Sequence, residues 1–204
     1  MTHLGGWLFR HRTIIPLPLA IAVLLLRIGE APPSKWLIAS GIGLTLTGEA
    51  IRLWAVHHIG AISRTRSDRL GPLIAAGPFA VVRNPLYLGN IALWAGFAMA
   101  ARLLWLVPVI VVLLAVEYHA IVRWEEQVLE ARYGDEYRAY AARVPRWWPT
   151  FNRGARRTRR ENVFSANSAN SAVAFSWRET LFSERGTLIA IAAGFFLLWL
   201  KLRT

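Results

Sequence analysis

The stretch LYLGNIALWAGFAMAARLLWLVPVIVVLLAVEY, residues 86–118, consists of two apolar runs with Arg102 between them. The runs, Leu86–Ala101 and Leu103–Tyr118, have the composition of membrane-spanning helices, and the few residues that separate them leave room only for a short turn. We therefore expect a tight antiparallel helical hairpin. Its start and its finish return to the same face of the membrane.

Three further apolar runs lie outside this hairpin, at Ile14–Leu26, Trp36–Val56 and Thr187–Leu200. Of the 204 residues, 55% are hydrophobic and only 18% are charged, which is more apolar than an ordinary soluble domain. Several runs are shorter than the roughly 20 residues that cross a bilayer, so they must extend into flanking residues or lie in thinner membrane. The sequence predicts an all-α, polytopic transmembrane helical bundle of about five spans.

The formal net charge is +12, and the basic residues fall between the apolar runs rather than on one amphipathic face. This arrangement favours membrane topology over nucleic-acid binding. With a cytoplasmic N-terminus, most arginines lie in cytoplasmic loops, as the positive-inside rule requires. The opposite side receives only Arg27, Lys35, Arg102, Lys201 and Arg203. We expect an integral, multi-pass membrane protein with its N-terminus and main polar loops in the cytoplasm, and no nucleic-acid partner.

The expected domain organisation has three parts. Residues 1–150 form the membrane-embedded core, with four spans and a short interfacial helix after Tyr118. Residues 151–186 form a linker with the basic tract Arg156–Arg160 and a Ser/Asn/Ala-rich stretch, which suits a solvated tether near anionic lipid headgroups. Residues 187–204 form an additional C-terminal transmembrane helix.

Two cytoplasmic stretches contain polar residues that a simple scaffold does not require. The first is GPFAVVRNPLYLG, residues 77–89, which leads into the hairpin. The second begins with RWEEQVL, residues 123–129, and continues with YGDEYRAY, residues 133–140, and with VPR, residues 144–146. Because the hairpin turns at Arg102 on the far side, its two ends return to one membrane face and we expect the two stretches to meet there.

These stretches resemble the signature of the isoprenylcysteine carboxyl methyltransferase-like family and of the related phospholipid methyltransferases. The resemblance covers about Gly48 to Pro149, and several fixed residue types recur at matching spacing. It implies an S-adenosylmethionine-dependent transfer of a methyl group to a lipid-like or small amphiphilic acceptor. The cofactor would enter from the cytoplasm into a pocket built around the hairpin, and the acceptor would come from the lipid bilayer.

The resemblance also implies site residues by position. Many relatives have His where this chain has Asn84, and because Asn does not titrate, a binding role is favoured there over acid–base work. Carboxylates suit the ammonium and ribose hydroxyls of the cofactor, and arginines suit carboxylates. The expected cofactor-binding residues are Arg83, Asn84, Tyr87, Leu88, Glu125, Glu126, Tyr137 and Arg146.

The expected catalytic residues are Arg83, Arg123 and Glu126, and the expected substrate-site residues are Glu49, Arg52 and Arg64. Glu49 and Arg52 are charges within a predicted span, so they are expected either to hold the bundle as an ion pair or to form the floor of the pocket. For the other residues, a role without catalysis or binding remains open. Arg83 is also typical of a positive-inside residue, and the two glutamates at 125 and 126 of a solvated helix face.

Two other functions remain open. Sterol reductases resemble the family in the same region, which leaves an NADPH-dependent membrane reductase as an alternative. A non-catalytic membrane scaffold that uses Arg156–Arg160 to hold a partner or anionic lipid is the second. No metal site is expected, because the chain has no cysteine and His57, His58 and His119 lack the spacing of helical metal ligands.

Overall fold

The computed structural model describes residues 2–12, 14–60, 73–149 and 176–203, and the regular secondary structure in these ranges is helical throughout. The all-α fold class is therefore confirmed. Arg64 and the Arg156–Arg160 tract lie outside the described residues. The elements are α1 Thr2–His11, α2 Leu17–Leu25, α3 Lys35–Ile59, the 3-10 helix η2 Gly77–Ala80, α4 Pro85–Ala100, α5 Leu106–Tyr133, α6 Asp135–Arg143 and α8 Trp177–Arg203.

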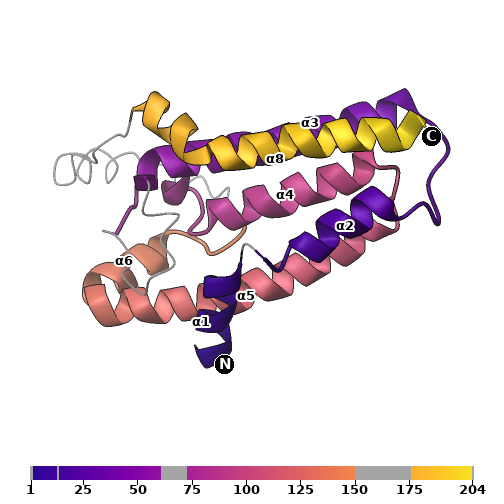
Figure 1. Ribbon diagram of the computed structural model, residues 1–204. Helices are drawn as coiled ribbons and strands as arrows, with labels where there is room; N and C mark the ends of the chain where they lie inside the picture. Colours follow the sequence, from indigo (N-terminus) through magenta and orange to yellow (C-terminus); the bar gives the residue numbers. More distant parts are fainter. Residues whose placement is uncertain (1, 13, 61–72, 150–175, 204) are drawn as a thin grey trace.

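The long helices run roughly along one common direction (Figure 1). In the view of Figure 1, α3 and α8 lie along one side, α4 lies in the middle, and α2 and α5 lie on the other side. At one end of the bundle, α6 folds back from the end of α5, and α1 crosses α5. The C-terminus lies at the opposite end.

Two of the described helices, α5 and α8, are long and apolar enough to cross a membrane. Helix α4 is apolar but has only 16 residues, and α2 has nine. Many large apolar side chains are exposed, such as Trp36, Val116 and Phe182, and exposed apolar surface on this scale suits a lipid-facing protein. The structure supports a membrane protein, and the count of five spans stays a prediction.

Helices α3 and α4 pack closely because glycines stand where the two helices touch. A Cβ atom added to Gly48 would lie 2.5 Å from the carbonyl oxygen of Gly89, and one added to Gly41 would lie 2.4 Å from the backbone nitrogen of Ala100. Gly43, by contrast, has no such neighbour within 4 Å. This approach brings Arg52 of α3 beside Asn90 of α4.

The expected hairpin is formed by α4 and α5, and its second helix is longer than the predicted span. Helix α5 continues past Tyr118 to Tyr133 without a break. It ends there because the next residue, Gly134, has a positive φ of 49°, which is typical of a helix C-terminus. The polar stretch after Tyr118 therefore forms the end of α5 itself, and α6 follows it.

Helix α8 begins before the predicted C-terminal span. The backbone nitrogen of Ser176 donates to Glu179 at 3.1 Å, and the Ser176 hydroxyl accepts from the backbone nitrogen of Arg178 at 3.3 Å. Ser-x-x-Glu is the sequence signature of a helix start, so the helix begins at Trp177 rather than at Thr187. The last part of the expected linker is helical.

Candidate active site

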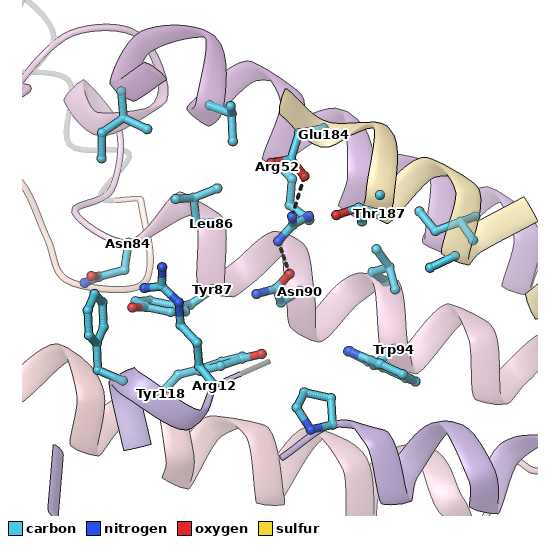
Figure 2. Close-up of a pocket in the computed structure, with 18 of the residues that line it drawn as sticks. Arg12, Arg52, Asn84, Leu86, Tyr87, Asn90, Trp94, Tyr118, Glu184 and Thr187 are labelled. Carbon is cyan, nitrogen blue, oxygen red and sulfur yellow. Dashed lines mark hydrogen bonds and ion pairs between the residues drawn. The ribbon is translucent and has the colours of Figure 1, made fainter. Parts of the chain in front are cut away.

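A cavity of about 850 Å³ lies between α2, α3, α4, α5 and α8. Its volume is near the upper end of the range for small-molecule sites, about 300–1,000 Å³. Figure 2 shows charged and polar side chains at one end and in the middle, and apolar side chains such as Trp94 beyond them. The cavity therefore changes from polar to apolar along its length.

An ion-pair cluster forms where the two polar stretches meet. Arg83, between η2 and α4, places its Nη1 3.0 Å from Oε1 of Glu126 and donates to the Tyr137 hydroxyl at 3.3 Å. Arg146 donates to both oxygens of the Glu126 carboxylate, from Nε at 2.8 Å and from Nη2 at 2.7 Å. Two arginines from different stretches thus share one carboxylate on α5, and Arg146 binds it in the bidentate geometry that strengthens such pairs.

Backbone contacts hold the same two stretches together. The backbone nitrogen of Arg83 donates to the Pro145 carbonyl at 2.9 Å, and Asn84 Nδ2 donates to the Arg146 carbonyl at 3.1 Å. The Tyr140 hydroxyl donates to the Phe79 carbonyl at 2.8 Å. The convergence expected from the hairpin is thus present in the structure, and backbone as well as side-chain groups fix it.

Next to this cluster, tyrosines and a carboxylate line the cavity. The Tyr87 hydroxyl donates to Oε1 of Glu125 at 2.9 Å, and the rings of Tyr87 and Tyr118 stack with their centroids 4.7 Å apart. Figure 2 shows Arg12 beside these two rings. The N-terminal segment, which the sequence analysis did not include in the site, thus contributes a cation to the cavity.

A second polar cluster surrounds Arg52, deeper in the bundle. Its Nε lies 3.0 Å from the Glu49 carboxylate on the same helix, and its Nη2 lies 2.8 Å from the Glu184 carboxylate on α8. Its Nη1 donates to the amide oxygen of Asn90 on α4 (Figure 2). The glutamates are buried, with 4% and 2% of their surfaces exposed. One guanidinium therefore joins three helices in the wall of the cavity.

The groups on α6 and after it are set up to bind rather than to exchange protons near neutral pH. Burial, reinforced by the nearby Glu126 carboxylate, raises the pKa of Tyr137, and burial raises the pKa of Tyr140. The hydrogen bond to Glu126 raises the pKa of Arg146. The two tyrosines therefore stay protonated and Arg146 stays charged.

The structure brings most of the expected site residues together, but not all of them. Arg146 and Glu49 contact lining residues without being among the lining residues themselves. Leu88 does not line the cavity and Leu86 does, since the two point to different faces of α4. Arg123 is exposed and also lies away from the lining. The expected residues that line the cavity are Arg52, Arg83, Asn84, Tyr87, Glu125, Glu126 and Tyr137.

The sequence analysis missed several polar lining residues, among them Arg12, Asn90, Tyr118 and Glu184. A usable signal existed for Asn90, which is a polar residue in an apolar run, three positions after Tyr87 and so on the same helix face. No local signal marks Glu184, because its partner Arg52 lies 132 positions earlier in the chain.

Residues 36–136 match the phospholipid methyltransferase family, as the resemblance predicted. The chain is also 25% identical over 152 residues to the nickel-cobalt-cadmium resistance protein NccN of Alcaligenes xylosoxydans xylosoxydans, covering 72% of this chain and 68% of that protein. It is 28% identical over 109 residues to the cobalt-zinc-cadmium resistance protein CzcN of Cupriavidus metallidurans, covering 53% of this chain and 46% of that protein. No solved structure matches the chain.

The matched region contains α4, all of α5 and all of α3 except its first residue. It therefore includes Arg83, Asn84, Tyr87 and both glutamates at 125 and 126. It ends before Tyr137 and Arg146, and α8 lies outside it. Among the described residues, no group of three or more histidine, aspartate or glutamate side chains is arranged to hold a metal ion.

Proposed function

Since residues 36–136 belong to the phospholipid methyltransferase family, we propose that this membrane protein transfers a methyl group from S-adenosylmethionine to a lipid-like or small amphiphilic acceptor. One observation carries the proposal. The two polar stretches at the ends of the α4–α5 hairpin meet at the cavity through Arg83, Glu126 and Arg146. This arrangement gives the cavity one strongly polar end for a charged cofactor and one apolar end for an acceptor.

The residues at the polar end fit the groups of S-adenosylmethionine. Arg83 lines the cavity, and its buried Nε has no hydrogen-bond partner within the described part of the chain. A ligand carboxylate would satisfy this donor, and the Asn84 amide lies next to it in the sequence. The Glu125 carboxylate suits the cofactor's ammonium or ribose hydroxyls. The stacked rings of Tyr87 and Tyr118 suit a sulfonium, by cation–π attraction.

When bound, S-adenosylmethionine supplies an electrophilic methyl group on a positively charged sulfur. The side chains around it contribute by holding the two reactants in line and by excluding water. Arg146 and Tyr137 fix the Glu126–Arg83 pair, so that these groups need no reorganisation when the ligand arrives. The Arg52 cluster lies between the polar and apolar parts, where it suits the polar group of the acceptor.

Binding measurements with two cofactor types test this proposal. Titration calorimetry on the purified protein in detergent should detect S-adenosylhomocysteine and not NADPH. Arg83→Gln should weaken this binding, and Arg138→Gln, an exposed arginine on α6, should leave it unchanged. Binding of NADPH alone would favour the reductase, and binding of neither cofactor would favour the scaffold.

The names of the two relatives connect them with metal resistance, and we propose that the methyl transfer serves metal tolerance in the cell as well. Cells that lack this protein should then grow poorly on cobalt or cadmium. The wild-type chain should restore growth, and an Arg83→Gln chain should not. Equal restoration by both chains would separate metal tolerance from the proposed reaction.

A further inference from the structure

Helix α8 forms one wall of the cavity although it lies outside the region that matches the family. The residues of α8 that line the cavity recur three or four positions apart and so share one helix face. Most are small or aliphatic. They are Glu184, Gly186, Thr187, Ala190, Ile191, Ala193, Gly194 and Leu197.

This face has a polar start and an apolar continuation. At its start, Glu184 contacts Arg52 at 2.8 Å and is itself buried, and Figure 2 shows Thr187 close to the same cluster. Beyond Thr187 the cavity is bounded by apolar side chains of α2, α4 and α8. The polar cluster and the apolar part belong to one continuous cavity, so a single amphiphilic molecule can occupy both.

At the far end, α8 approaches α4 closely. A Cβ atom added to Gly194 would lie 2.8 Å from the Phe97 ring, and the rings of Phe97 and Phe195 pack at 5.3 Å between centroids. Ala190, nearer to the polar cluster, also faces the cavity and has a minimal side chain. Gly194 thus allows the two helices to pack closely, whereas Ala190 leaves space in the cavity that a larger side chain would fill.

We propose that α8 is the element that selects the acceptor. Glu184 is a positioning residue that holds Arg52 at the level of the acceptor's polar group, and the face from Thr187 to Leu197 holds one hydrocarbon chain of the acceptor. The acceptor is therefore an amphiphile with a long apolar chain that lies along α8, between α2 and α4. This inference rests on the proposed methyl transfer where it identifies the bound molecule as the acceptor. The binding of an apolar chain along α8 can be measured separately.

Photolabelling tests the occupancy without knowledge of the natural acceptor. The probe is hexadecanol that carries a diazirine in the middle of its chain, added to membranes that contain the full-length protein. In the wild-type chain it should label Leu93 and Trp94, which line the apolar part, and excess unlabelled hexadecanol should compete. Ala190→Phe should remove most of this labelling, because the added ring occupies the chain's path.

Ala192→Phe is the matched control, because Ala192 lies on α8, is exposed and does not face the cavity. It should leave the labelling of Leu93 and Trp94 unchanged. Phe196 and Trp199 lie on exposed parts of α8, and their labelling should continue in both variants. This result would show that α8 is still folded and membrane-embedded in each variant. Equal labelling of Trp94 in the wild-type chain and in Ala190→Phe would overturn the inference, as would its absence in the wild-type chain.

A second measurement tests the role of Glu184. Glu184→Gln should raise the concentration of unlabelled hexadecanol that is needed to halve the labelling of Trp94. Glu184→Asp should bring this concentration part of the way back to the wild-type value. The affinity for S-adenosylhomocysteine should stay at the wild-type value in both variants. Equal loss of both ligands would mean that Glu184 only supports the fold, and would contradict its positioning role. Failure of the wild-type chain to bind S-adenosylhomocysteine, with the labelling pattern intact, would refute the proposed function and leave the chain site standing.

Discussion

Arg146 and Glu126 are 20 positions apart in the sequence and form two hydrogen bonds, at 2.8 and 2.7 Å, at the polar end of the cavity. Arg83 contacts the same carboxylate at 3.0 Å. One acidic side chain on α5 thus holds the segments that precede α4 and follow α6. Substitutions in this cluster and at three other places in the chain test these contacts.

Glu126→Gln should destabilise the protein, because it leaves two neighbouring arginines without the charge they share. Loss of charged hydrogen bonds of this kind costs about 2 kcal/mol. The measurement is the free energy of unfolding in detergent by chemical denaturation. Glu130→Gln is the control on the same helix, since the Glu130–Arg138 pair is largely exposed and such pairs contribute about 0–1 kcal/mol. Equal effects of the two changes would contradict the cluster's structural role.

Tyr87→Phe should weaken S-adenosylhomocysteine binding by about tenfold, corresponding to the loss of one hydrogen bond to a charged group. The change removes the hydroxyl that donates to Glu125 at 2.9 Å and keeps the ring stacked on Tyr118. Calorimetry measures the affinity. Tyr133→Phe, at the end of α5 and away from the cavity lining, should have no effect. Unchanged affinity in Tyr87→Phe would remove this pair from the cofactor site.

Gly48→Ala and Gly43→Ala should have opposite effects on stability, although both replace a glycine in α3. A Cβ atom at position 48 meets the backbone of Gly89 at 2.5 Å, so the helices must separate, at a cost of about 1–3 kcal/mol. At position 43 nothing lies within 4 Å, and alanine should stabilise the helix by about 0.5–1 kcal/mol. Melting temperatures decide this, and a stable Gly48→Ala protein would contradict the close packing of α3 and α4.

Glu30 should make the end of the bundle opposite α6 sensitive to acid. Burial alone would raise its pKa, but the hydrogen bond and charge of Lys201, together with the charge of Arg102, outweigh burial and lower the pKa. A lowered pKa in the folded state stabilises the protein above the ordinary value of 4.5, and this contribution is lost as the pH falls further.

Glu30→Gln should therefore lower stability at neutral pH and flatten the dependence of the unfolding midpoint on pH below about 4.5. Asp135→Asn is the control, because Asp135 is almost fully exposed. Parallel pH profiles for the wild-type chain and Glu30→Gln would show that Glu30 does not contribute in this way.

The sequence was sufficient for the hairpin and for the meeting of its two polar ends. These predictions depend on local features: the long apolar runs, the single turn at Arg102 and the fixed spacing around Arg83 and Glu126. Such features can be read from neighbouring residues without knowledge of the tertiary contacts. It was harder to predict which side chains of a helix point into the cavity. Leu88 was expected in the site and Leu86 lines the cavity instead, because two positions along a helix rotate a side chain to a different face.

The contributions of distant segments could not be predicted from the sequence. Arg12 and Glu184 come from the two ends of the chain, and only tertiary packing brings them to α3, α4 and α5. The early start of α8 had a signal, the Ser-x-x-Glu pattern at Ser176 and Glu179, but it lies in a polar stretch that otherwise suits a linker.

The central claim is that Glu126, Arg83 and Arg146 organise a methyl-transfer site at the mouth of a lipid-accessible cavity. The most direct test supplies S-adenosylmethionine with a labelled methyl group to membranes that contain the wild-type chain, the Arg83→Gln variant or no added protein. The account predicts label in an organic-solvent extract of the wild-type membranes and little above background in the other two. Equal label in all three extracts would contradict it.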